Sequence, residues 1–129
     1  MIDINKQVSH WSRGANEDFI VAKELIERGR IRHGLFFAHL AIEKILKSHV
    51  CRHTNDLAPP VHNLVRLAEK TGLNFSQEQI DLLAEVNEFN IEGRYPELSL
   101  PQPREDEAIS YLKRIEGFLK WSIKLLEQS

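Results

Sequence analysis

The sequence has little cysteine and no long apolar run. Its one cysteine, Cys51, excludes an internal disulfide and a zinc site built on cysteines, and it suits a reducing compartment. No apolar run approaches the roughly 20 residues that a membrane-spanning helix needs. The first residues, MIDINKQVSHW, are too polar for a secretory signal. We therefore expect a soluble, cytoplasmic protein that makes no use of a membrane.

The short motifs of the common cofactor and catalytic sites are also missing. The chain contains no Gly-x-Gly-x-x-Gly, no P-loop and no Gly-x-Ser-x-Gly. Its six histidines include no compact metal-binding pattern such as His-Glu-x-x-His. We therefore expect neither a cofactor nor a metal.

The composition is that of one ordinary globular domain. The 129 residues are 42% hydrophobic and 28% charged, which predicts a single domain over residues 1–129. A formal net charge of −2 argues against a protein whose whole surface grips nucleic acid. A local basic cluster remains, which is either a solvated turn between helices or a binding patch: Arg28, Arg30, Arg32 and His33.

Apolar residues recur with the 3.6-residue period of helices, and no stretch alternates with period two. The pattern predicts an all-α fold, an antiparallel up-and-down bundle of about five helices with a four-helix-bundle core. The predicted helices cover about Asn5–Arg28, His33–His53, His62–Lys70, a segment from Ser76 that fades near Asn90, and Glu105–Glu127.

Local signals support several of these boundaries. Gly29 stands where a C-terminal cap belongs, and Ser76 with Gln79 makes a capping-box pattern. The helix over 33–53 is apolar on most sides and is therefore expected at the centre. The last helix has a second apolar edge that one thin bundle need not bury, which favours a homodimer: Phe118, Trp121 and Leu125.

Three polar residues follow one another at helical spacing on the central helix, namely His39, Glu43 and Lys47. Charges on such a face must be paired or close to water, because burying a lone charge is costly. One interpretation is an ordinary i,i+4 pair between Glu43 and Lys47. The other is that Glu43 orients an arginine from elsewhere, with Arg94 the best candidate.

The segment NIEGRYPELSL separates two strongly helical stretches. Pro96 pushes Tyr95 into an extended conformation, so the helix cannot continue through it. Arg94 and Tyr95 suit pairing with a phosphate and stacking on a base. They equally suit a tyrosine that closes the bundle while the arginine pairs with an acid. His62, expected at a helix start and therefore neutral, is either a proton acceptor or a hydrogen-bonding surface residue.

The motifs FFAHLAIEKILKSHV, VHNL and GRYPE, in this order, resemble the HEPN domain family, and EDFIVAKELIERGR resembles its first helix. The resemblance implies a single HEPN-like helical domain that usually dimerises. It also implies a small nucleotidyltransferase partner in a toxin–antitoxin-like module. The positions that match the family's motifs are Glu43, Lys44, Lys47, His62, Arg94, Tyr95 and Pro96.

The family also contains metal-independent ribonucleases with an arginine followed, after four to six residues, by a histidine. No histidine follows Arg94. The pairs Arg28–His33 and Arg32–His39 have this spacing, but they lie around the start of the second predicted helix, which is the wrong place for the family's site.

Three hypotheses remain, in this order. The first is a nucleotide- or RNA-binding subunit that acts with a small nucleotidyltransferase. The second is a helical dimerisation or interaction module without a ligand. The third is a metal-independent endoribonuclease toxin with His62 and Arg94 as weak catalytic candidates. The expected ligand-binding residues are Glu43, Lys47, His62, Arg94 and Tyr95.

Overall fold

The computed structural model describes residues 1–91 and 103–128, and all of its regular elements there are helical. This confirms the predicted all-α fold. In chain order the elements are α1 (Ile4–Glu27), α2 (Ile31–Thr54), α3 (Leu64–Glu69), α4 (Gln77–Asn87), the 3₁₀ helix η1 (Glu88–Ile91) and α5 (Glu105–Glu127).

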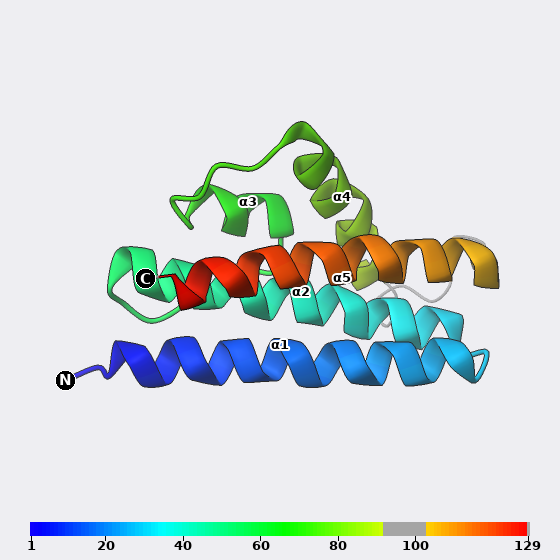
Figure 1. Ribbon diagram of the computed structural model, residues 1–129, viewed down its shortest axis with the longest axis horizontal. Helices are drawn as coiled ribbons and strands as arrows, with labels where there is room; N and C mark the ends of the chain where they lie inside the picture. The colour runs from blue at the N-terminus through cyan, green and yellow to red at the C-terminus, as the bar shows by residue number, and fades with distance from the viewer. Residues whose placement is uncertain (92–102, 129) are drawn as a thin grey trace.

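The three long helices lie along one another, and the short ones cover one side (Figure 1). α1 runs antiparallel to both α2 and α5, while α3 and α4 lie on the opposite side of α2 and α5 from α1 (Figure 1). Among the described residues, no helix combines the length and the apolarity that crossing a bilayer requires.

The helix ends follow the local signals of the sequence. Gly29 has a φ of 80°, and the amides of Gly29 and Arg30 donate to Ile26 and Leu25, which closes α1 in a Schellman turn. Ser76 and Gln79 form the predicted capping box at the start of α4.

The third helix begins two residues later than predicted. The side chain of Asn63 accepts a hydrogen bond from the amide of Arg66 and so acts as the N-cap. His62 therefore lies just before α3 and not in its first turn. The argument for a neutral His62 assumed that this residue lies in the first turn of the helix. It therefore does not hold for the observed position.

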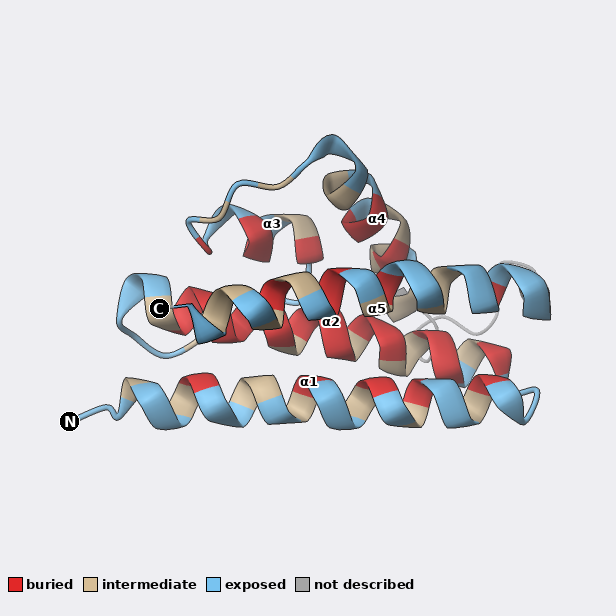
Figure 2. Ribbon diagram, viewed as in Figure 1, coloured by how far each residue is buried: buried red, intermediate tan, exposed pale blue. Residues whose placement is uncertain are grey.

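α2 is the centre of the bundle, as its apolar pattern predicts. Fifteen of its 24 residues are buried, and Ile42, Ile45 and Leu46 are wholly inaccessible to solvent (Figure 2). Helices from both sides pack on it, so a side chain of α2 can meet residues from α1, α3 and α5 alike.

The second apolar edge of α5 is used within the chain. Phe118 is only 3% exposed. The ring of Phe75, between α3 and α4, packs on this edge, with its centroid 6.1 Å from that of Phe118 and 5.5 Å from that of Trp121. Phe118 is therefore used within the chain, whereas Trp121 and Leu125 of the predicted edge stay partly exposed. The homodimer itself stays a prediction.

Two hydrogen bonds join the second half of α2 to the end of α5. Nε2–H of the buried His49 donates to the carbonyl oxygen of Ser122 at 2.9 Å, and Arg52 donates to that of Leu126 at 2.7 Å. Burial lowers the pKa of His49 from its ordinary value of 6.5, and the nearby Arg52 lowers it further, although the Ser122 bond acts in the other direction. The folded chain therefore holds His49 neutral.

A lowered pKa in the folded state makes stability depend on pH. The unfolded chain binds this proton at a higher pH than the folded chain does, so stability falls as the pH drops through the unfolded value of 6.5. We expect the stability advantage of the wild type over His49→Gln, whose amide can still donate to Ser122, to shrink between about pH 7.5 and 5.5. Urea unfolding followed by circular dichroism measures this, and a difference independent of pH would contradict it.

Candidate functional site

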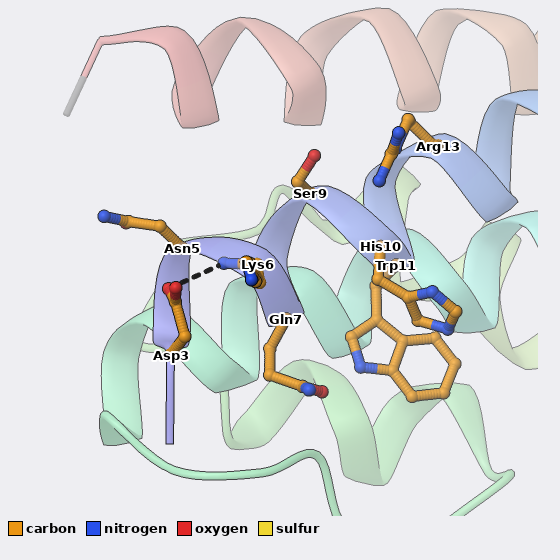
Figure 3. A pocket seen from close by; sticks show the side chains of 8 residues that line it. All are labelled: Asp3, Asn5, Lys6, Gln7, Ser9, His10, Trp11 and Arg13. Atoms are coloured by element: carbon orange, nitrogen blue, oxygen red, sulfur yellow. Dashed lines mark hydrogen bonds between the residues drawn. The ribbon is translucent and has the colours of Figure 1, made fainter. Parts of the chain in front are cut away.

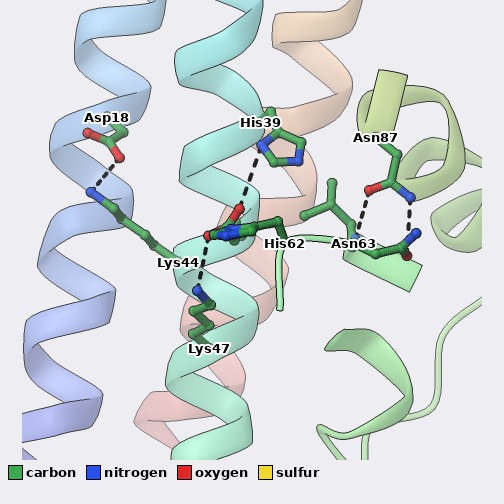
Figure 4. Close-up of polar contacts among 9 residues, drawn as sticks. Asp18, His39, Lys44, Lys47, His62, Asn63 and Asn87 are labelled. Carbon is green, nitrogen blue, oxygen red and sulfur yellow. Dashed lines mark hydrogen bonds and ion pairs between the residues drawn. The ribbon is translucent and has the colours of Figure 1, made fainter. Parts of the chain in front are cut away.

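The carboxylate of Glu43 lies at the centre of a polar cluster just beneath the surface. Its Oε2 is 3.1 Å from Nζ of Lys47, one turn further along α2, and 3.1 Å from Nδ1 of His62 (Figure 4). The side chains of Glu43 and Lys47 are each 7% exposed, whereas that of His62 is 53% exposed. The cluster therefore presents one accessible imidazole over a buried ion pair.

This arrangement meets the requirement that a buried carboxylate be paired. Oε2 receives both contacts, while Oε1 is 3.9 Å from Nδ1 of the buried His39, which is too far for a hydrogen bond. Within residues 1–91 and 103–128, no group donates a hydrogen bond to Oε1. Among these residues, Oε1 of Glu43 is thus an acceptor without a donor.

Trp11, on α1, completes the surroundings of Lys47. The ammonium lies 5.1 Å from the centroid of the Trp11 ring, within the range of a cation–π interaction. The same indole stands beside His10, at 5.3 Å between ring centroids, in a shallow depression of the first turns of α1 (Figure 3). Lys47 is therefore held between a carboxylate and an aromatic face.

Two asparagines fix the segment that carries His62. The Oδ1 of Asn87, at the end of α4, accepts a 2.7 Å hydrogen bond from the amide of Leu64, and its amide group donates to Oδ1 of Asn63 at 3.4 Å (Figure 4). Because Asn63 also caps α3, the residue after His62 is held from two directions. His62 is consequently positioned by α3 and α4 as well as by Glu43.

The contact with Glu43 decides what His62 can do. A carboxylate next to Nδ1 keeps the proton of the neutral ring on that nitrogen, because the carboxylate is an acceptor. Nε2 is then left with its lone pair for a ligand. The imidazole can accept a hydrogen bond or a proton there, and when protonated it can donate one to an anion.

The predicted site residues fall into three groups. Glu43, Lys47 and His62 are brought together. Lys44 faces another way and forms a 2.7 Å ion pair with Asp18 of α1 (Figure 4). The remaining predicted residues lie outside the described part of the chain, so a pair between Glu43 and the arginine there stays a prediction: Arg94, Tyr95 and Pro96.

The structure also places the residues of the other two arginine–histidine spacings, and the view that these spacings are coincidental stays a prediction. His33 is exposed at the start of α2, whereas His39 is buried one turn before Glu43. Arg28 and Arg30 are exposed at the turn between α1 and α2, in keeping with a solvated turn.

Three residues of the site were not anticipated. The apolar pattern of α1 assigns Trp11 to the core, and nothing local to α1 shows that a lysine on α2 meets its ring. Asn63 could have been found, because asparagine before an apolar helical run is an N-cap signal. For Asn87 we find no such signal, since its partners are about twenty residues away.

No three His, Cys, Asp or Glu side chains in the described ranges lie close enough together to hold a metal ion. The expectation of a metal-free protein stays a prediction, because residues 92–102 are not included in this statement.

Fold and site together define a small helical bundle with a buried acid, a lysine and an accessible histidine in one cluster. Residues 8–126 match the HEPN domain family, and the chain belongs to this family. The crystal structure of TT1696 from Thermus thermophilus is similar, with a TM-score of 0.71 over 90% of this chain and 98% of that one. At 17% identity this likeness concerns the fold alone. No curated protein matches the sequence.

A double-mutant cycle tests the buried pair. Replacing Glu43 with Leu leaves Lys47 charged and without its carboxylate, and we expect it to lower the free energy of unfolding by about 3–5 kcal/mol. Glu43→Leu combined with Lys47→Met removes both charges and should regain most of that loss. Urea denaturation of the wild type, both single variants and the double variant measures this coupling. Additive effects would mean that the two groups do not stabilise each other.

Proposed function

We propose that this chain is a HEPN subunit that binds a nucleotide or RNA and acts with a small nucleotidyltransferase in a toxin–antitoxin-like module. The observation that carries the proposal is the half-exposed imidazole of His62, anchored at Nδ1 by a buried carboxylate. A histidine held in this way is a rigid donor or acceptor for a phosphate or a base edge.

The remaining residues take distinct roles in this proposal. Glu43 and Lys47 are almost fully buried, so they support His62 and do not reach the ligand themselves. Arg94 pairs with phosphate, and Tyr95 stacks on a base. The acceptor left on Oε1 of Glu43 supports a contact with Arg94, because a guanidinium presents several donors.

We place binding ahead of cleavage because the arginine–histidine motif of the family's ribonucleases is missing after Arg94. The sequence has no Arg-x4-6-His motif that begins at Arg94, so the arginine and histidine of a family ribonuclease are not found together there. The charges of Glu43 and Lys47 offset each other within the cluster. Binding one phosphate therefore needs only one further cation nearby, which agrees with a binding role.

Binding can be measured by isothermal titration with ATP, AMP and a short single-stranded RNA. We expect His62→Ala and Arg94→Ala each to weaken binding by about tenfold or more, because each removes a hydrogen bond to the ligand. His33→Ala is the matched control, since His33 is exposed at the start of α2 and away from the cluster. Ligand should also raise the melting temperature of the wild type by mass action.

The partner is tested by asking whether a small nucleotidyltransferase is encoded next to this chain and, where one is, whether the two proteins purify together when expressed together. Absence of binding to any of these ligands, together with no co-purifying transferase, would end this proposal. A melting temperature that no ligand raises would favour the ligand-free interaction module.

The contact of His62 with Glu43 also supports a second candidate function, that of a metal-independent endoribonuclease. A histidine oriented by a carboxylate is the arrangement that a general base requires, and an arginine beside it would stabilise the charge of the phosphorane. It predicts RNA cleavage in the presence of EDTA, lost in both His62→Ala and Arg94→Ala while the circular dichroism spectrum is unchanged. Intact RNA after long incubation with the purified wild type would exclude it.

A further inference from the structure

An open depression of about 700 Å³ lies along the first turns of α1 (Figure 3). Trp11 lines it, and the ring of the same residue meets the ammonium of Lys47 in the His62 cluster. The depression and the candidate site therefore adjoin one another at Trp11. A role for the depression in binding rests on the proposed function, because a ligand held at His62 would have to continue into it.

A series of contacts leads from His62 to the depression. Nδ1 of His62 and Nζ of Lys47 each lie 3.1 Å from Oε2 of Glu43. The Lys47 ammonium is 5.1 Å from the centroid of the Trp11 ring, and that centroid is 5.3 Å from the centroid of His10. His10 is exposed, as His62 is, and Trp11 is half-buried. Two accessible imidazoles thus stand at the two ends of one continuous row of side chains.

The exposed face of α1 at this depression carries cations. Lys6, His10 and Arg13 follow one another at helical spacing and are all exposed, so they share one face of the helix. Among the described residues, neither Lys6 nor Arg13 forms an ion pair. Asp3 is the acid among the residues that line the depression, and its carboxylate accepts a hydrogen bond from the amide of Lys6. The next acid of this face, Glu17, does not line the depression.

We propose that the ligand of this chain is a single-stranded RNA of several nucleotides, which runs from His62 across Trp11 onto the start of α1. Lys6 and Arg13 contact phosphates of the strand, while the ring of His10 and the exposed part of the Trp11 ring stack on its bases. Every base can stack on an aromatic ring, so the strand is bound with little preference for sequence. A mononucleotide occupies only the part of the site around His62.

The length of the ligand tests this path. Isothermal titration should show that the wild type binds an RNA octanucleotide about tenfold or more tightly than AMP, because further phosphates and bases are held. Lys6→Ala combined with Arg13→Ala should weaken octanucleotide binding by about tenfold or more and leave AMP binding unchanged. The slope of log affinity against log salt concentration should become shallower by about 1.4, since each phosphate contact of a single strand contributes about 0.7.

The stacking contact is tested separately from the charges. His10→Ala should weaken octanucleotide binding by about fivefold or more, with no change for AMP, because a base loses the ring on which it stacks. His62→Ala should weaken the binding of both ligands. Circular dichroism melting of each variant shows whether it is folded.

Lys23→Ala combined with Lys113→Ala is the matched control. It removes the same charge from the exposed residues that line the groove between α1 and α5, and it should leave the affinity and the salt slope unchanged. Octanucleotide binding no tighter than that of AMP, unaffected by the α1 variants, equally weakened by the control pair, or independent of His62 would each overturn this path. Loss of AMP and octanucleotide binding in His62→Ala alone would leave the proposed function standing without it. A wild type that binds neither ligand would overturn both.

Discussion

The burial of one carboxylate, that of Glu43, sets the conditions for the rest of the site. An acid at the centre of the most buried helix must be paired, and its partners come from the same helix and from the connection to α3. Lys47, which pairs with this acid, also packs against the ring of Trp11 on α1. One charge thus joins three parts of the chain, and the accessible member of the cluster, His62, is oriented as a consequence.

The position of His62 also depends on contacts far from Glu43. Asn87 holds the start of α3 to the end of α4, and Phe75 packs the connection between them on Phe118 and Trp121 of α5. A bidentate contact of Arg114 with Glu85, together with the hydroxyl of Tyr111, joins α4 to α5 and lowers the pKa of Glu85. The short helices are therefore fixed to the long ones by aromatic packing at one end and by ionic contacts at the other.

Sequence periodicity predicted the helices well, but it did not predict which residues of different helices contact one another. The Gly29 turn, the Ser76 capping box and the central place of α2 follow from signals within one helix, and so does the Glu43–Lys47 pair. The contact between His62 and Glu43 joins residues 19 apart, and periodicity does not say which element faces a given side of a helix. For the same reason the sequence did not show that Phe75 packs on Phe118 and Trp121 of the predicted apolar edge.

The two proposed functions, binding RNA and cleaving it, place different demands on the groups around His62. Cleavage needs a group that moves a proton and a second group that stabilises the negative charge developing on phosphorus. His62 has the geometry for the first role. Lys47 cannot take the second, because its ammonium is occupied by Glu43 and Trp11 and is nearly closed to solvent. Within the described residues, the cluster of Glu43, Lys47 and His62 therefore offers an accessible histidine but no accessible cation, so both proposed functions call for Arg94.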